Sequence, residues 1–240
     1  MLFSVGKLHN CVRKAEERNK MGKKIGVLLS GCGVQDGSEI HEATLTLLAL
    51  DKLGAEVIPI AVNKLCEVFD HSKGQPVPEK RNAMIESARI SRGKITDAAR
   101  ARANDLDALI IPGGSGAAKN LSNYAIRGTG CTVDPSVGKL IAGMIDAKKP
   151  IGAICIAPAA LAAALRAIDV NGVKMTIGND PKTAGNINEM GQVHVDCPVD
   201  DIVIDSEHKI VTTPAYMLAG SIKEIQPAIE KLVNKVYELA

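Results

Sequence analysis

The sequence has almost no aromatic residues: its 240 residues include no Trp, two Phe and three Tyr. Platforms that stack nucleic-acid bases, and cages for large ligands, are built from such side chains, so both are excluded. An excess of one charge is also missing, because 29 Lys and Arg against 27 Asp and Glu give a net charge of +2, too little for a broad basic surface. We therefore expect no nucleic-acid partner and a small substrate, polar or aliphatic.

Long apolar runs and paired cysteines are also absent. No stretch approaches the roughly 18 to 20 apolar residues of a membrane span, so no membrane partner is expected. The cysteines form no C-x-x-C pair or zinc-type Cys/His cluster, and the H-E of residues 41–42 lacks the second histidine of H-E-x-x-H. We expect no metal, no other cofactor, free thiols and a reducing, cytoplasmic location. The cysteines are Cys11, Cys32, Cys66, Cys131, Cys155 and Cys197.

Residues 1–22 differ in character from the rest of the chain. They lack the apolar core of a secretory signal, and two glutamates among their basic residues argue against a transit peptide. The charged residues are Lys7, Arg13, Lys14, Arg18 and Lys20, with Glu16 and Glu17. We expect residues 1–22 to be an N-terminal extension, or to reflect an upstream start codon, and residues 23–240 to form a single domain.

From residue 23 onward, apolar strand-like runs alternate with helix-like segments. Residues 70–80 contain one glycine and two prolines and predict a loop. Segments 202–204 and 210–212 flank a polar turn and predict an antiparallel hairpin at the edge of a mostly parallel sheet. The expected fold is a three-layer α/β/α sandwich. Strands are predicted at 25–29, 56–62, 107–111, 151–154 and 173–177. Helices are predicted at 43–53, 137–147, 157–167, 181–188 and from 222 onward, with one or two more across 81–103.

Cys155 stands where the apolar run of residues 151–154 gives way to an Ala- and Leu-rich helix. The N–H groups at a helix start carry partial positive charge, which favours a thiolate over a thiol. Pro158 suits the first turn of a helix, because its missing N–H is not needed there. Cys155 is therefore a candidate nucleophile. The alternative is inert packing, because cysteine is among the most buried residue types.

The candidate partners of Cys155 lie at the same edge of the sheet, since ligands of open α/β sheets bind outside the carboxyl ends of the strands. The N–H groups of Gly114 and Ile156 are placed to form an oxyanion hole for charge that develops beside the sulfur. Glu39, at the start of the first helix, is the candidate acid or base and is placed to hydrogen-bond the sulfur. Its alternative role is to cap that helix.

Other features at this edge carry weaker signals. Residues 31–37 match G-x-G-x-x-x-G loosely, without the acidic ribose ligand of a dinucleotide site, and residues 113–120 lack the G-K-[ST] ending of a phosphate loop. Asn120, at the end of the second loop, is expected near the pocket. Cys32 borders the site or packs beneath its loop, and Cys131 lines a pocket. His194 is expected to support the site from behind rather than to act as a base.

Four segments together resemble the DJ-1/PfpI superfamily, whose fold is shared with class I glutamine amidotransferases. They are LSG leading to SE at residues 29–39, DALIIPGG at 107–114, AICIAPAAL at 153–161 and KIVTTP at 209–214. Further runs resemble its ElbB branch, also called sigma cross-reacting or lycopene-enhancing protein. These runs are SGCG at 30–33, GSEIHEA at 37–43, AAKNLSN at 117–123 and CPVDDIV at 197–203.

The resemblance implies a flavodoxin-like, class I glutamine amidotransferase-like fold for residues 23–240. It also implies that Cys155 is the nucleophile, with Glu39 as its carboxylate partner. Gly114 and Ile156 would be the oxyanion donors, and His194 the supporting histidine. One departure matters: peptidase-like members and amidotransferases place a histidine next to the cysteine or in a later triad motif, whereas Ile156 follows Cys155 here. This departure argues against peptidase and glutaminase chemistry.

The function implied by the resemblance is a glyoxalase-like conversion of glyoxal, or a related small 2-oxoaldehyde, to a 2-hydroxy acid without glutathione. The Cys155 thiolate would add to the aldehyde, and Glu39 would move a proton between carbons through an enediol. The same chemistry could act in deglycation. The alternatives are a redox-sensing or regulatory protein linked to isoprenoid biosynthesis, in which Cys155 is oxidised, and an amidotransferase subunit. A homodimer is expected by analogy with the superfamily.

Overall fold

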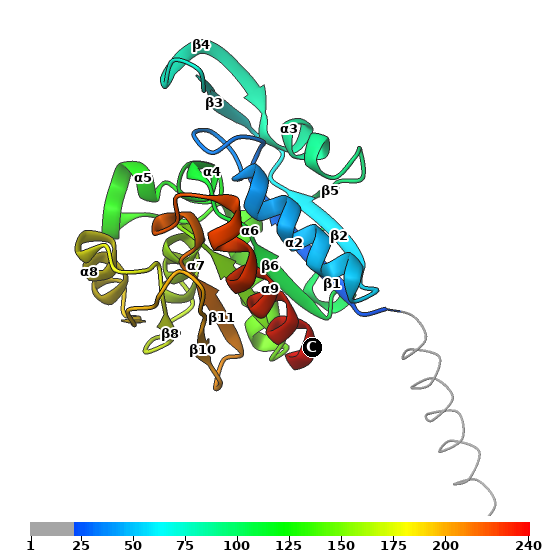
Figure 1. Cartoon of the computed structure of the whole chain (residues 1–240), viewed down its shortest axis with the longest axis vertical. Coiled ribbons are helices and arrows are strands. Elements are labelled where there is room, and N and C mark those ends of the chain that lie inside the picture. Colours follow the sequence, from blue (N-terminus) through cyan, green and yellow to red (C-terminus); the bar gives the residue numbers. More distant parts are fainter. Residues whose placement is uncertain (1–21) are drawn as a thin grey trace, which may run out of the picture.

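A computed structural model describes residues 22–240, which contain a central seven-stranded sheet (Figure 1). The strand order is β10-β11-β7-β6-β1-β2-β5, and neighbouring strands are parallel except β10 and β11 at one edge. The predicted mostly parallel sheet with an antiparallel edge hairpin is confirmed. Its strands are β1 (Lys24–Leu29), β2 (Glu56–Ala61), β5 (Thr96–Asp97), β6 (Ala108–Ile111), β7 (Ile151–Ile154), β10 (Val203–Asp205) and β11 (Ile210–Thr213).

Helices cover both faces of this sheet and so form the predicted three-layer sandwich. One face carries α2 (Ile40–Lys52) and α9 (Ile222–Leu239), which lie side by side in Figure 1. The other face carries α4 (Ser115–Lys119), α6 (Pro135–Asp146) and α7 (Ala157–Arg166). Within residues 22–240, no helix combines the length and apolar composition needed to cross a membrane. The predicted N-terminal extension lies outside the described residues, apart from Gly22.

The alternation of side chains along each strand divides the core between the two faces. In β1, Val27 and Leu29 pack with residues of α2 and α9, whereas Leu28 packs with residues of the opposite helices. In β6, Ile110 likewise packs with residues of α2 and α9, and Leu109 packs with residues of the opposite helices. Because both faces are covered, these strands are apolar at successive positions. This burial explains the short continuous apolar runs in the sequence.

The β3–β4 hairpin, which projects from one end of the molecule (Figure 1), replaces most of the loop predicted at residues 70–80. That prediction is wrong because Pro76 and Pro78 are tolerated in a ribbon of only two strands, where one side of each strand needs no ladder partner. Of the one or two helices predicted across 81–103, one α-helix forms, over Ala83–Ile90, and the strand predicted at 173–177 pairs outside the central sheet. The remaining elements are β3 (Leu65–Asp70), β4 (Gln75–Asn82), α3 (Ala83–Ile90), η1 (Ala103–Asp105), α5 (Tyr124–Arg127), η2 (Gly128–Gly130), β8 (Lys174–Met175), α8 (Pro181–Glu189), β9 (Val193–His194) and η3 (Ala215–Met217).

Candidate active site

Cys155 occupies a strained turn between β7 and α7 at the carboxyl edge of the sheet. Its φ of 61° is a left-handed value, which costs a non-glycine residue roughly 1–3 kcal/mol. The Cys155 N–H donates to the carbonyl oxygen of Thr213 on β11 at 2.9 Å, so the neighbouring strand holds the turn. Cys155 is 8% exposed. The sulfur therefore lies just beneath the surface, in a backbone conformation that the surrounding structure imposes.

Two glycines after β6 make room for this turn. A Cβ on Gly113 would lie 2.4 Å from the Cβ of Cys155 and 2.6 Å from Oε2 of Glu42. Gly114 has a φ of 93°, and a Cβ there would lie 2.3 Å from the backbone nitrogen of Glu39. Non-bonded atoms do not approach so closely. The two glycines therefore allow the start of α2 and the Cys155 turn to meet at short range.

Glu42 is the carboxyl group beside Cys155. It lies in the first turn of α2, is fully buried and shares a hydrogen bond with the Cys155 side chain. Its Oε2 accepts from the Gly113 N–H at 2.9 Å, and its Oε1 accepts from the Tyr216 N–H at 3.3 Å. Burial, followed by the charge of Glu39, raises the pKa of Glu42 to about 8, because a buried carboxylate loses its hydration.

The surroundings of Cys155 shift the pKa of its thiol in opposite directions. Burial, followed by the charge of Glu42, raises the pKa of Cys155 well above its ordinary value, while hydrogen bonds from the N–H groups of Gly114 and Ile156 lower it. The net direction is upward, the reverse of the lowering expected from the helix start, because burial outweighs the N–H groups. The thiol and the carboxyl thus both hold their protons at neutral pH, and the carboxyl of Glu42, with a pKa of about 8, is the one nearer to ionising there.

Glu39 caps α2 instead of contacting the sulfur as predicted. Its Oε2 accepts from the Glu42 N–H at 2.7 Å, which is the alternative role named for it. The hydrogen bond to Cys155 belongs to Glu42, because the position three residues later, nearly one helical turn, faces inward. The sequence does carry a signal for this: Glu42 falls on the same buried face of α2 as Ala49 and Leu50. A carboxyl group on an apolar helix face is a candidate site residue.

His41 and Tyr216 adjoin the two glutamates. Nδ1 of His41 lies 2.8 Å from the Tyr216 hydroxyl and 3.8 Å from Oε1 of Glu39. The Tyr216 N–H reaches Glu42, as described above, and the His41 side chain is 46% exposed. These two residues therefore connect the buried carboxyl groups to solvent. In the sequence, His41 stands out only as part of an incomplete zinc motif, and nothing marks Tyr216, which lies 175 residues away.

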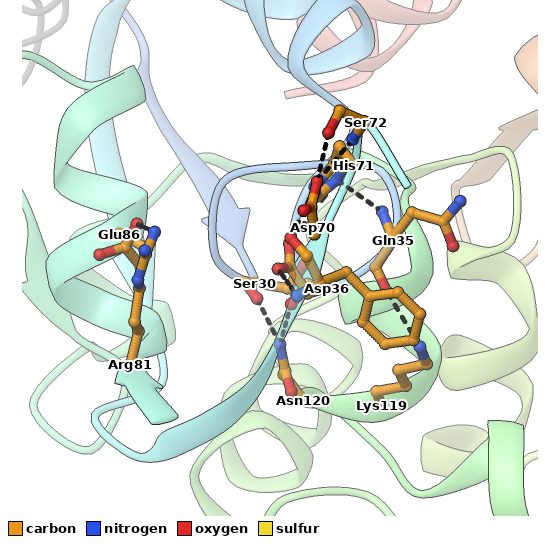
Figure 2. Close-up of polar contacts among 11 residues, drawn as sticks. Ser30, Gln35, Asp36, Asp70, His71, Ser72, Arg81, Glu86, Lys119 and Asn120 are labelled. Carbon is orange, nitrogen blue, oxygen red and sulfur yellow. Dashed lines mark hydrogen bonds and ion pairs between the residues drawn. The ribbon is translucent and has the colours of Figure 1, made fainter. Parts of the chain in front are cut away.

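Asn120 fastens the loop of residues 31–37, which leads into α2. Its Nδ2 donates to the carbonyl oxygens of Ser30 at 2.7 Å and Asp36 at 2.8 Å (Figure 2). The side chain is buried, and the Gly116 N–H of α4, the helix that Asn120 follows, donates to the Gly37 carbonyl at 2.9 Å. Asn120 therefore positions the loop that precedes the two glutamates, and its amide is already occupied by these carbonyls.

The β3–β4 hairpin is attached to the outer side of the same loop (Figure 2). The Gln35 N–H donates to Nε2 of His71 at 3.2 Å, and the Phe69 N–H donates to Oδ2 of Asp36 at 2.8 Å. Lys119 donates to the Gln35 carbonyl at 2.9 Å and lies over the Phe69 ring, 4.3 Å from its centroid. The loop is thus held between the hairpin and α4.

Cys32 lies in this loop, partly exposed, and faces the hairpin. It lines a cavity of about 20 Å³ together with Cys66, Arg81 and Glu86. Burial, followed by the charge of Glu86, raises the pKa of Cys32. The sequence left open whether Cys32 borders the active site or packs beneath its loop, and these contacts place it with the hairpin.

Cys131 and His194 lie apart from the cluster around Cys155. Cys131 is buried in the core, with its sulfur 3.8 Å from that of Met190, so it packs rather than lining a pocket. Nε2 of His194 accepts from the Ile177 N–H at 3.3 Å, and burial lowers its pKa. Among the residues that the structure describes, no hydrogen bond or ion pair joins either side chain to Cys155, and no three His, Cys, Asp or Glu residues could hold a metal ion.

A three-layer sandwich with a cysteine at a strained strand-to-helix turn defines a class I glutamine amidotransferase-like α/β domain. The model of the DJ-1/PfpI family matches residues 32–217, which is more than half of the chain. The chain belongs to the DJ-1/PfpI family.

Two curated relatives and one solved structure resemble the chain over most of its length. The human glutamine amidotransferase-like class 1 domain-containing protein 3, mitochondrial, is 43% identical over 227 residues, which are 90% of this chain and 83% of the relative. The rat ES1 protein homolog, mitochondrial, is 41% identical over 90% of this chain and 84% of the relative. The solved structure is a crystal structure of an isoprenoid biosynthesis protein with an amidotransferase-like domain from Ehrlichia chaffeensis. It is 40% identical, has a TM-score of 0.84, and the match covers 91% of this chain and 99% of that one.

The names of the relatives correct the expected cytoplasmic location. Both the human and the rat protein are named mitochondrial, which points to mitochondria rather than the cytoplasm. The expectation depended on the free thiols and on two glutamates in residues 1–22. Free thiols indicate only a reducing environment, which does not distinguish these compartments. The same segment carries five basic residues against those two glutamates, and an excess of Arg and Lys is typical of mitochondrial targeting.

Proposed function

We propose that this protein is a glyoxalase-like enzyme that converts glyoxal, or a related small 2-oxoaldehyde, to a 2-hydroxy acid without glutathione. The observation that carries the proposal is the buried pair of Cys155 and Glu42, in which the carboxyl group has a pKa of about 8. A general base works best when its pKa lies near the operating pH. We also propose a homodimer in the mitochondrion.

The first step forms a carbon–sulfur bond. Ionised Glu42 accepts the thiol proton of Cys155 as the sulfur attacks one aldehyde carbon, and the carbonyl π electrons move to oxygen. The N–H groups of Gly114 and Ile156 converge beside the sulfur, where they stabilise that oxygen anion. Glu42 then returns its proton to the oxygen, which gives a hemithioacetal and leaves the carboxylate free for the next step.

The second step moves hydrogen between carbons. Glu42 removes the proton from the carbon that carries the sulfur, and the electrons of that C–H bond form an enediol with the second carbonyl. Glu42 delivers its proton to the second carbon, and the hydroxyl proton on the first carbon moves to the oxygen of the second, which gives a thioester of the 2-hydroxy acid on Cys155. Water then attacks the thioester and releases the acid, and the thiol is restored. The sum is one dialdehyde plus one water to one 2-hydroxy acid, without an external oxidant.

The test is turnover of glyoxal to glycolate by three variants. Cys155→Ser and Glu42→Gln should each reduce kcat at least a hundredfold, because each removes a group that takes part in bond making. Glu39→Gln is the matched control: its amide oxygen still accepts from the Glu42 N–H. Since the charge of Glu39 raises the pKa of Glu42, its loss should shift the rise of activity with pH to below pH 8.

Two results would overturn the proposal. One is wild-type turnover in Cys155→Ser. The other is loss of activity in Glu39→Gln together with full activity in Glu42→Gln, which would return the catalytic role to Glu39.

An amidotransferase function is the second candidate, and the names of the human and Ehrlichia relatives favour it. Glutamine hydrolysis uses a cysteine nucleophile assisted by a base, and here Glu42 occupies the position beside the sulfur. Release of ammonia from glutamine by wild-type protein, absent in Cys155→Ala, would support this function. A low-pKa thiol sensor has less support, because burial and Glu42 raise the pKa of Cys155.

A further inference from the structure

A hollow of about 230 Å³ lies alongside β2 at the β5 edge of the sheet, and Cys155, Glu42 and Gly113 are not among its lining residues. Lys24 and Leu106, two of its lining residues, stand at the amino end of β1 and just before β6. Cys155 follows the carboxyl end of β7. The hollow therefore does not belong to the candidate active site.

The short edge strand β5 creates this hollow. Only Ile60 and Ala61 of β2 pair with β5, so the edge of the sheet is uncovered beside the earlier residues of β2. The segment of residues 99–106, which contains the short helix η1, lines the hollow beside this region. The floor of the hollow is apolar, since Ile58, Ile60 and Leu106 line it. Ile60 and Leu106 also belong to the buried core, so the floor is part of the rigid sandwich.

The rim of the hollow is basic. Arg100 and Arg102 line it together with Lys24, against a single carboxylate from Asp105. Lys24 has a distant partner, Glu56, at 3.8 Å. Arg100 and Arg102 have no ion-pair partner and donate no side-chain hydrogen bond within residues 22–240. Surface arginines are commonly paired with acidic groups where such groups are near, so two unpaired guanidinium groups at one apolar hollow leave donors for an anion.

The same two arginines line a second, larger hollow. A cleft of about 1050 Å³ lies between residues 99–104 and α6, and Arg100, Arg102 and Lys139 line it. The arginines therefore stand on a ridge between the two hollows. An anionic group held on this ridge has room to extend away from the protein through the cleft, while an aliphatic group attached to it has an apolar floor on the other side.

We propose that this hollow is a second ligand site, which binds a soluble, short-chain aliphatic phosphate. The phosphate dianion lies on Arg100 and Arg102, and the alkyl chain lies on Ile58, Ile60 and Leu106. Planar guanidinium groups bind phosphate oxygens in pairs, and two such groups match the two negative charges. The absence of aromatic side chains from the lining disfavours a nucleotide base as the apolar part.

The volume of the hollow limits the length of the alkyl chain that it can hold. A space of 230 Å³ is about the volume of seven or eight water molecules, which is close to that of an equal number of methylene groups. Each methylene buried in an apolar site strengthens binding by about fourfold. Affinity should therefore rise along a series of alkyl phosphates up to about eight carbons and then remain constant, because longer chains leave the hollow.

Isothermal titration calorimetry of the full chain with inorganic phosphate, hexyl phosphate and octyl phosphate tests this proposal. Octyl phosphate should bind about fifteenfold more tightly than hexyl phosphate, inorganic phosphate should bind most weakly, and hexanol should show no binding. Affinities that are equal for inorganic phosphate and octyl phosphate would overturn the proposal. So would binding to vesicles that contain phosphatidic acid without binding of free octyl phosphate, since the ligand would then be a membrane lipid.

Two variants separate the head group from the chain. The double variant Arg100→Gln and Arg102→Gln should weaken binding of octyl phosphate at least tenfold, whereas the matched control Arg127→Gln and Lys182→Gln, with the same change of charge, should leave it within twofold. Ala101→Phe fills the hollow and should remove the dependence on chain length while retaining weak binding of inorganic phosphate. An equal loss in the control pair would show general charge attraction and would overturn the site.

Discussion

Replacement of Glu42 by Gln should change how the stability of the protein depends on pH. Glu42 is fully buried, and its carboxyl oxygens accept backbone hydrogen bonds from Gly113 and Tyr216. Its pKa of about 8 in the folded protein compares with an ordinary value of 4.5. The variant keeps the size of the side chain and removes its ionisation. Any difference in the pH dependence of unfolding therefore reports on this one carboxyl group.

The sign and size of the effect follow from the two pKa values. Below pH 4.5 the carboxyl is protonated in both states, so its ionisation does not affect stability. Between pH 4.5 and 8 the unfolded carboxyl ionises and gains hydration while the folded one keeps its proton, so the free energy of unfolding falls as pH rises. Above pH 8 both are ionised and the loss is constant. A difference of about 3.5 in pKa corresponds to a total loss of about 5 kcal/mol.

Urea unfolding at pH 5, 6, 7 and 8 measures this loss. The stability of Glu42→Gln relative to wild type should increase by about 3 to 4 kcal/mol from pH 5 to pH 8. A constant offset will accompany it, because the amide NH₂ faces a backbone N–H where the carboxyl accepted a hydrogen bond. In the Cys155→Ala background the same slope should appear, since burial is the largest cause of the raised pKa. A difference that stays constant within about 1 kcal/mol across this range would refute the reasoning.

Two further substitutions test how the site is held together. Gly113→Ala places a methyl group 2.4 Å from the Cβ of Cys155 and should lower stability by about 1–3 kcal/mol, seen as a fall of several degrees in Tm. Gly138→Ala is its control, because a Cβ there meets nothing within 4 Å and α6 should gain stability; equal Tm values for the two variants would contradict the packing argument. Asn120→Ala leaves the Ser30 and Asp36 carbonyls without their donor and should cost about 2–3 kcal/mol in urea unfolding. A loss below about 0.5 kcal/mol would show that the loop does not depend on Asn120.

Much of the fold could be predicted, because strands covered on both faces are apolar at successive positions and therefore stand out. The runs that became β1, β6 and β7 lie within about two residues of their predicted bounds. The β3–β4 hairpin could not be predicted in the same way. Its strands are largely exposed, so they carry little apolar pattern, and the two prolines of β4 are typical of a loop.

The candidate site, too, could be predicted only in part. A cysteine between an apolar strand and a small-residue helix indicates a strand-to-helix turn, and the structure places Cys155 in one. Which glutamate meets it depends on the rotation of α2 about its axis, and a shift of three positions brings Glu42 to the sulfur in place of Glu39. That rotation is set by the packing of Ala49 and Leu50 against the sheet, which is a tertiary contact.

The sequence by itself therefore determined the sandwich, the family and the position of Cys155, because these follow from local periodicity and contiguous motifs. Only the tertiary structure decided the environment of the sulfur. Gly113 and Glu42 lie 71 residues apart in the sequence. In the folded protein both lie against Cys155, and this contact excludes water from the sulfur and the carboxyl group. Exclusion of water raises both pKa values, and neither value can be read from the residue type alone.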